Sequence, residues 1–265
     1  MILTERQRGP EIMLRRMKED HLHGLPARHL HVEPSTMPPA QAEAYRAVVE
    51  NARHDVPILK VLQDLRAVSL HPDSEFDGDL ESYIQNSARL VETFRILDAV
   101  RDRREKALLF CEAIAMQEFL TEALPKKYVM PGPLKVINGN VPGHKRKDFV
   151  DEFQDRPGFD VMVLSPRAGG VGLTLTAANH VIHLSRWWNP AVEDQCTDRV
   201  LRIGQQKPVH VYLPIARHPQ YGDSSFDVKL DRLLSRKRQL SRELLAPAGA
   251  TKSDLDELYH STTHQ

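Results

Sequence analysis

Hydrophobic positions follow two different patterns along the chain. In the first part they recur every three or four positions, as at Leu90, Phe94 and Leu97, which is the spacing of one helix face. Further along, short apolar runs alternate with helical patterns, and these runs are ALLFC, LKVIN, DVMVLS, HVIHLS and VHVYLPIA. Continuous apolar runs are typical of strands that are buried on both faces, as in a parallel sheet. The pattern therefore predicts a helical segment over residues 36–101 and a doubly wound α/β domain over residues 102–216.

The two ends of the chain are more polar. Residues 1–35 mix basic, acidic and histidine residues, and they predict one short helix at EIMLRRMKED followed by an extended linker. Residues 217–265 include SFDVKLDRLLSRKRQLSRELL, which predicts a long helix rich in Arg and Lys. We expect the last dozen residues to fray. The basic run over residues 236–238 is typical of a solvated helix face.

Composition narrows the class of protein. Hydrophobic residues make up 41% and charged residues 27%, which is the balance of a globular protein with a sizeable core. Lys and Arg number 36, as do Asp and Glu, so any surface for nucleic acid has to be a local patch. Cys111 and Cys196 lie in apolar-rich segments, which favours buried, reduced thiols over a disulfide. There is no HExxH and no paired CxxC, so a metal site is not expected. The sequence has neither an apolar run of membrane-spanning length nor a signal-peptide pattern, and we expect a cytoplasmic protein.

A glycine-rich loop follows one of the predicted strands. The segment SPRAGGVG, Ser165–Gly172, comes directly after the run DVMVL, so it should lie at the carboxyl edge of the sheet, where ligands bind in open parallel sheets. Glycines allow close backbone approach, and such a loop can bind an anion through its N–H groups. An ordinary turn after a strand explains the glycines equally well, so the loop alone leaves both interpretations open.

Three polar residues of the next predicted helix share one face. In AVEDQCTDRVLRI, Gln195, Arg199 and Arg202 are spaced four and then three positions apart. Two arginines on one face near the ligand edge suit a polyphosphate, because guanidinium groups stay charged and donate in forked pairs. The alternative is a solvated face on which Arg199 pairs with Asp194 or Asp198.

Other residues in this region are less informative. We expect Trp187 and Trp188 to pack, one against the sheet and one against a loop, rather than to stack on bases. The cluster HKRK, residues 144–147, opens a predicted helix, where the helix dipole disfavours cations. These charges either face a phosphate backbone or form a solvated helix start.

Taken in order, the motifs resemble the C-terminal half of Swi/Snf-type ATPases, the double-stranded-DNA translocases of helicase superfamily two. KALLFCEA resembles motif IV of that family, and VINGNVPGHKRKDFVDEFQ resembles the segment that follows it. LSPRAGGVGLTLTAANHVIHLSRWWNPAVEDQCTDRVLRIGQQ resembles motifs V and VI together. MLRRMKED resembles the connector between the two lobes, and ILKVLQDLRAVSLHP resembles the helical segment, so the resemblance runs from residue 12 to about 216. Asn138, Ser185 and Cys196 depart from the residues usual at their positions.

The resemblance implies a RecA-like fold and a set of roles. Such enzymes hydrolyse ATP in a cleft between two RecA-like lobes. In motif VI, Gln195 would face the nucleotide together with two arginine fingers, Arg199 and Arg202, of which Arg202 is the stronger candidate. In motif V, Gly170 and Gly172 would line the cleft. The residues that would face the DNA backbone are Ser165, Arg167, Asn138, Gly139, Lys145 and Arg146.

The sequence lacks the phosphate-binding parts of such an enzyme. It contains no GxxxxGK motif and no strand-ending Asp-Glu-x-His, and the near match DELYH lies in the polar tail. In the family that it resembles, these parts belong to the N-terminal lobe. The resemblance therefore implies ATP with Mg²⁺ held mainly by that lobe, double-stranded DNA as a partner, and an N-terminal ATPase lobe acting in trans. On its own the chain should bind ATP weakly and hydrolyse essentially none.

Domain organisation and function follow from the same resemblance. We expect an inter-lobe connector over 1–35, a helical segment packing on the lobe over 36–101, the RecA-like lobe over 102–216, and a basic helix and tail over 217–265. The expected function is that of the C-terminal lobe of an ATP-dependent DNA translocase. Whether the first lobe is a separate polypeptide, or has been lost by truncation or gene splitting, stays open. The alternative is a non-catalytic module, derived from such a motor, that binds DNA or a partner protein. The presence of both fingers and Gln195 argues against that alternative.

Overall fold

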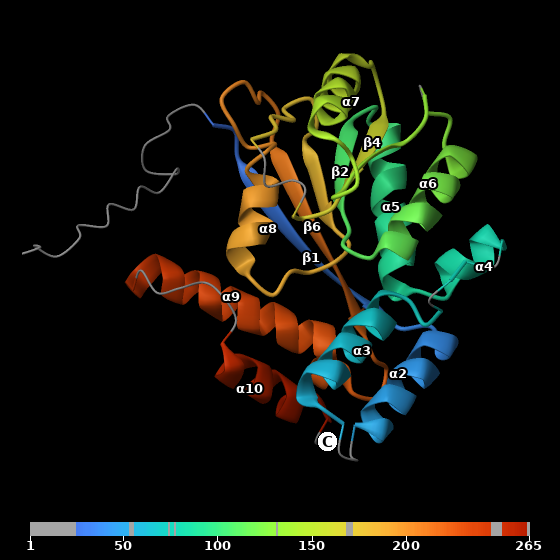
Figure 1. Cartoon of the computed structure of the whole chain (residues 1–265), viewed down its shortest axis with the longest axis vertical. Helices are drawn as coiled ribbons and strands as arrows, with labels where there is room; N and C mark the ends of the chain where they lie inside the picture. The colour runs from blue at the N-terminus through green and yellow to red at the C-terminus, as the bar shows by residue number, and fades with distance from the viewer. Residues whose placement is uncertain are drawn as a thin grey trace, which may run out of the picture.

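The core of the molecule is one parallel β-sheet (Figure 1). The computed structural model describes residues 25–52, 56–73, 75–76, 78–130, 132–167, 172–244 and 251–263. The strands are β1 (Arg28–Thr36), β2 (Lys106–Phe110), β3 (Lys135–Ile137), β4 (Asp160–Leu164), β5 (His180–His183) and β6 (Val209–Arg217). Their order in the sheet is β1-β6-β5-β2-β4-β3, and every pair is parallel. This confirms the predicted doubly wound α/β architecture.

Helices cover both faces of the sheet. They are α2 (Pro39–Asn51), α3 (Ile58–Leu70), α4 (Leu80–Gln85), α5 (Ala88–Asp102), α6 (Ile114–Lys127), α7 (Gly143–Asp155), α8 (Pro190–Thr197), α9 (Phe226–Leu244) and α10 (Lys252–Thr263). Along β2, Ala107 and Leu109 pack with residues of α5 and α6, whereas Leu108 and Phe110 pack with residues of α7 and α8. This alternation buries the strand on both sides, which is why its sequence is a continuous apolar run. Within the described segments, no helix combines the length and apolar character needed to cross a membrane.

A second group of helices, α2, α3, α9 and α10, forms a helical layer beside the sheet, at the bottom of the view in Figure 1. Its core contains Tyr45 from α2, Leu62 from α3, Phe226 from α9 and Leu258 from α10, all of them buried. The C-terminal segment is therefore part of the packed structure. The expected fraying of the last dozen residues is wrong for residues 254–263, because α10 packs its apolar side on α9 and α3.

The segment that reads as an extended linker in the sequence is extended, but it forms the edge strand of the sheet. Over its whole length β1 pairs with β6, from Arg28 beside Val209 to Thr36 beside Arg217. The pairing partner is distant in sequence, so the local pattern of β1 does not reveal it. The short helix that we expect at EIMLRRMKED lies outside the described residues.

Within the predicted helical segment, residues 80–102 are divided into α4 and α5. The division lies at Ser87, whose hydroxyl accepts a hydrogen bond from the Leu90 N–H at 3.2 Å and donates one to the Leu70 carbonyl at 2.6 Å. A serine in this position caps a new helix, because its oxygen satisfies a free N–H group of the first turn. The cap therefore begins α5 as a helix separate from α4.

Candidate functional site

The motif segments meet at the carboxyl edge of the sheet. Backbone hydrogen bonds hold the loops after neighbouring strands side by side. Ser165 N–H donates to the Ile137 carbonyl at 2.9 Å, and Ser185 N–H donates to the Phe110 carbonyl at 3.2 Å. The loops after β2, β3, β4 and β5 therefore form one continuous rim, as expected for a ligand-binding edge of a parallel sheet.

On this rim the exposed Arg167 lies beside the half-buried Trp187. The Arg167 guanidinium carbon lies 5.3 Å from the centre of the Trp187 ring, within the range of a cation–π contact. The guanidinium carbon of Arg66, on α3, lies 5.8 Å from the centre of the Trp187 ring and 5.6 Å from that of the Trp188 ring. Trp188 also packs edge-on against Phe226, as predicted for a packing residue. Arg167 is exposed and forms no ion pair with any described residue, so its charge is available to an external anion.

The turn after β3 is built by two of the predicted DNA-facing residues. Asn138 donates from Nδ2 to Gln117 Oε1 at 2.9 Å, and its Oδ1 accepts the Asn140 N–H at 3.0 Å. Arg146 donates to the carbonyls of Val141 at 2.7 Å and Asn138 at 3.2 Å. Both side chains are thus engaged in shaping the turn. Gly139 and Lys145, in contrast, are exposed.

The motif VI helix is shorter than its sequence pattern suggests. The helix α8 ends at Thr197, so Gln195 lies on it but Arg199 and Arg202 lie in the turns that follow. A long-range contact redirects the chain here, because the carbonyl of Arg199 accepts the Leu175 N–H at 3.0 Å. The prediction that all three side chains share one helix face is therefore wrong, although the two arginines stay close together.

Arg199 is a buried cation without a full set of partners. The residue is 4% exposed, and its Nε has no hydrogen-bond partner among the described residues. Burial lowers the pKa of Arg199, and the neighbouring charge of Arg202 lowers it further. The predicted alternative of a pair with Asp194 is wrong, since that carboxylate pairs with Arg28 and Arg238. The other predicted partner, Asp198, does attract Arg199 and raises its pKa, but less than burial lowers it. A buried guanidinium with an unused donor is a suitable partner for a phosphate oxygen.

Arg202 is held against the motif V segment. Its Nη1 donates to Thr174 Oγ1 at 3.0 Å, and its Nε donates to the Asp198 carbonyl at 3.1 Å. Gly172, two residues before Thr174, has a φ of +24° and open space where a side chain would begin. Gly170 lies outside the described residues. Motifs V and VI thus meet at Arg202, which is only partly buried.

A cluster of buried ion pairs beneath the rim was not predicted from the sequence. Arg186, 1% exposed, donates from Nε to Glu193 Oε1 at 2.8 Å and from Nη1 to Asp231 Oδ1 at 2.7 Å. Glu193 also accepts the Trp187 N–H at 2.9 Å and a hydrogen bond from Arg238 at 2.6 Å. Burial by itself would raise the pKa of Glu193, but Arg186, His183 and Arg238 hold it down at about 2. The only signal in the sequence was a charged residue, Arg186, directly after a buried strand.

Both cysteines are buried free thiols, as predicted. Burial raises the pKa of Cys111 to about 11 and that of Cys196 to about 12. Neither thiol is a reactive nucleophile at neutral pH. The chemistry of the rim therefore rests on its cations.

Comparison with known proteins agrees with this geometry. The helicase conserved C-terminal domain matches residues 88–204. A putative ATP-dependent helicase/translocase of Bacillus subtilis (strain 168), YwqA, is 34% identical over 207 residues, which is 76% of this chain and 22% of that protein. The Zorya protein ZorD of Escherichia coli O139:H28 is 33% identical over 252 residues, which is 88% of this chain and 23% of that protein. The chain thus spans less than a quarter of the length of these relatives.

Solved structures extend the likeness to three dimensions. The Sulfolobus solfataricus SWI2/SNF2 ATPase core in complex with dsDNA is 28% identical with a TM-score of 0.70, over 94% of this chain and 53% of that one. The C-terminal part of the Fun30 ATPase domain has the same fold, with a TM-score of 0.72 at 17% identity, over 91% of this chain and 99% of that one. With the parallel sheet and the motif rim already described, these matches lead to one assignment. The chain belongs to the helicase conserved C-terminal domains of the SWI2/SNF2 type of ATPase.

Proposed function

We propose that this chain is the second lobe of an ATP-driven motor that moves along double-stranded DNA in the cytoplasm. In the proposed motor a P-loop lobe holds ATP and Mg²⁺, and this chain completes the site with Arg199 and Arg202 as arginine fingers and with Gln195 beside them. The rim residues Ser165, Arg167, Gly139 and Lys145 contribute to the DNA track. Asn138 and Arg146 shape the turn that presents it.

The observation that carries the proposal is the environment of Arg199. A buried cation with an unused donor is costly, and proteins keep such groups mainly where a ligand supplies the missing partner. The Nε of Arg199 has no such partner among the described residues, and Arg202 lies close enough to lower the pKa of Arg199. Two adjacent cations of this kind fit the phosphates of a nucleotide.

The described residues suit the phosphates of a nucleotide but not the Mg²⁺ ion that accompanies them. Within the described residues, no group of three or more His, Cys, Asp or Glu side chains is arranged to hold a metal ion. The sequence also carries no GxxxxGK motif. In the proposal, therefore, the P-loop lobe supplies the phosphate cradle and the metal ligands, and this lobe supplies positive charge to the transition state.

The contribution of the fingers sets the size of the expected effect. An arginine finger typically accelerates phosphoryl transfer by about 10³ to 10⁵, or about 4 to 7 kcal/mol of barrier. It acts on a nucleotide that another surface holds in place. ATP would draw the two lobes together, and hydrolysis would release them, so that the pair steps along the duplex.

ATP hydrolysis tests the proposal. The chain is assayed with and without duplex DNA, alone and together with the P-loop lobe of its own motor on the same or a separate polypeptide. DNA-stimulated turnover is expected only when both lobes are present. Arg202→Ala and Arg199→Ala should each lower kcat by at least about 10³, with DNA affinity unchanged within about twofold.

Two outcomes would contradict parts of the proposal. Unchanged turnover in Arg202→Ala would remove the finger assignment. If no mixture hydrolyses ATP while the chain still binds DNA, the chain is a binding module and not half of a motor.

A further inference from the structure

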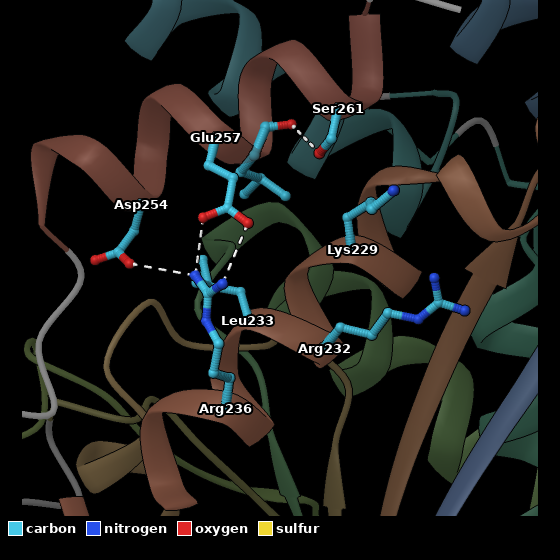
Figure 2. A pocket seen from close by; sticks show the side chains of 8 residues that line it. Lys229, Arg232, Leu233, Arg236, Asp254, Glu257 and Ser261 are labelled. Atoms are coloured by element: carbon cyan, nitrogen blue, oxygen red, sulfur yellow. Dashed lines mark hydrogen bonds and ion pairs between the residues drawn. The ribbon is translucent and has the colours of Figure 1, made fainter. Parts of the chain in front are cut away.

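The basic run of α9 is divided between two neighbouring helices. Arg236 pairs with Glu257 of α10 at 2.9 Å, and Lys237 pairs with Asp254 of α10 at 2.6 Å. Figure 2 shows Arg236 directed from α9 toward both acids of α10. The expectation of a solvated basic face is therefore wrong for Lys237, which is only 8% exposed and has its charge neutralised within the molecule, whereas Arg236 is exposed.

Arg238, the next residue, reaches in the other direction. Its Nη2 donates to Glu193 Oε2 at 2.6 Å, and its Nε lies 3.3 Å from Asp194 Oδ1. Both acids belong to α8, the helix of motif VI. The side chains of Arg238 and Glu193 are 19% and 2% exposed, so solvent screens this contact poorly.

The short helix α8 depends on such contacts for its position. With 8 residues it is too short to be stable by itself in water. Asp231 of α9 adds a second connection, because it pairs with Arg186, which in turn binds Glu193. The next residue after the two acids is Gln195, and Arg199 follows four residues later, in the turn after α8.

The remainder of α9 is anchored independently of these charges. Phe226, Leu230, Leu233 and Leu234 pack in the core of the helical layer. All of them lie in the first half of the helix, whereas Arg238 lies in the second half. Loss of the Arg238 charge should thus loosen α8, which keeps its contacts with Arg186 and Arg28, without unfolding α9.

We propose that Arg238 is a positioning residue for the ATP site: by holding Glu193 and Asp194 it fixes α8 and the turn that follows, and so directs Gln195 and Arg199 toward the nucleotide. The inference rests on the proposed function and assigns a role to the C-terminal helix in it. Displacement of a catalytic group by about 1 Å can cost up to about 10² in rate. A helix that lies outside the helicase motifs would therefore control how well the fingers act.

Arg238→Gln in the two-lobe motor is the test, with Arg236→Gln as the matched control. Both variants remove one positive charge from the same helix, but Arg236 faces α10 and Arg238 faces α8. Arg238→Gln should lower DNA-stimulated kcat about tenfold and change KM for ATP and the capacity for duplex DNA less than about twofold. Arg236→Gln should stay within about twofold of the parent in kcat, and Arg238→Lys should recover most of the loss.

Hydrogen exchange on the chain alone gives a second readout that needs no ATPase activity. Arg238→Gln should speed amide exchange in α8, and Arg236→Gln should speed it in α10 instead. Because unfolding would lower kcat and DNA-binding capacity together, a fall in kcat at full DNA capacity identifies a positioning effect.

The possible failures can be told apart. If the parent pair hydrolyses ATP and Arg238→Gln has the same kcat, this inference is overturned and the proposed function stays intact. Unchanged exchange in α8 overturns it as well. A parent pair that never hydrolyses ATP overturns the proposed function, and this inference with it.

Discussion

At the scale of single residues, two buried arginines have opposite environments. Arg186 is 1% exposed and pairs with Glu193 and Asp231. Arg199 is 4% exposed, and its Nε has no partner among the described residues. A paired buried charge is costly to break, because its removal leaves the other charges uncompensated, whereas a buried cation with an unused donor already carries part of its desolvation cost. The two residues should therefore respond differently to the same substitution.

Arg186→Met should lower the free energy of unfolding by about 3–5 kcal/mol, since it leaves the buried carboxylate of Glu193 with Arg238 alone and removes the cation that pairs with Asp231. Arg199→Met should leave it unchanged or raise it by about 1 kcal/mol, while ATP hydrolysis in the two-lobe motor is lost. Urea unfolding of the chain, monitored by circular dichroism, measures the free energy of unfolding of both variants. A loss of stability in Arg199→Met as large as that in Arg186→Met would show that its charge has a partner within the chain.

The sequence predicted which residues of the candidate site lie near one another better than it predicted their surroundings. Spacing and motif order selected Gln195, Arg199 and Arg202, and the structure brings both arginines to the motif V segment. Spacing could not predict that α8 ends at Thr197, because the hydrogen bond from Leu175 that redirects the chain comes from a distant segment. The ion pair of Arg186 was missed for the same reason.

At the scale of elements, the hydrophobic pattern succeeded where an element is specified locally. The five continuous apolar runs are the strands β2 to β6, and the long basic pattern is α9. The two elements that it missed, β1 and α10, are specified by distant partners. β1 completes the sheet beside β6, and α10 buries Leu258 in the helical layer.

One hydroxyl connects two of these elements. Tyr45 of α2 is fully buried, and its OH accepts the N–H of Phe226, the first residue of α9, at 2.8 Å. Tyr45→Phe removes the acceptor and leaves a buried N–H unsatisfied, so it should lower the free energy of unfolding by about 1–3 kcal/mol. Tyr221→Phe is the matched control, because no hydrogen bond of the Tyr221 hydroxyl occurs among the described residues, and it should change stability by less than about 0.5 kcal/mol. Equal effects of the two substitutions in thermal or urea unfolding would contradict the role of Tyr45.

At the scale of the whole molecule, histidines distributed along the chain gather in the sheet. His29 and His31 of β1, His210 of β6 and His180 of β5 form a stack, with neighbouring ring centres 5.1 to 5.3 Å apart. Burial lowers the pKa values of His180 and His210. On the opposite face of β5, burial lowers the pKa of His183 to about 4. The folded sheet therefore favours neutral imidazoles, whereas the unfolded chain binds protons near pH 6.5.

This difference predicts how stability depends on pH. Between about pH 6.5 and pH 4 the unfolded chain binds more protons than the folded one, so the free energy of unfolding should fall as the pH falls through this window. His183 alone should account for about 2 kcal/mol of the loss between pH 7 and pH 5. Urea unfolding at pH 7, 6 and 5 should show a smaller loss for His183→Gln than for the parent chain. His144→Gln, at an exposed position, should follow the parent. If the parent chain and His183→Gln lose the same stability on acidification, the buried imidazole is not the group that takes up the proton.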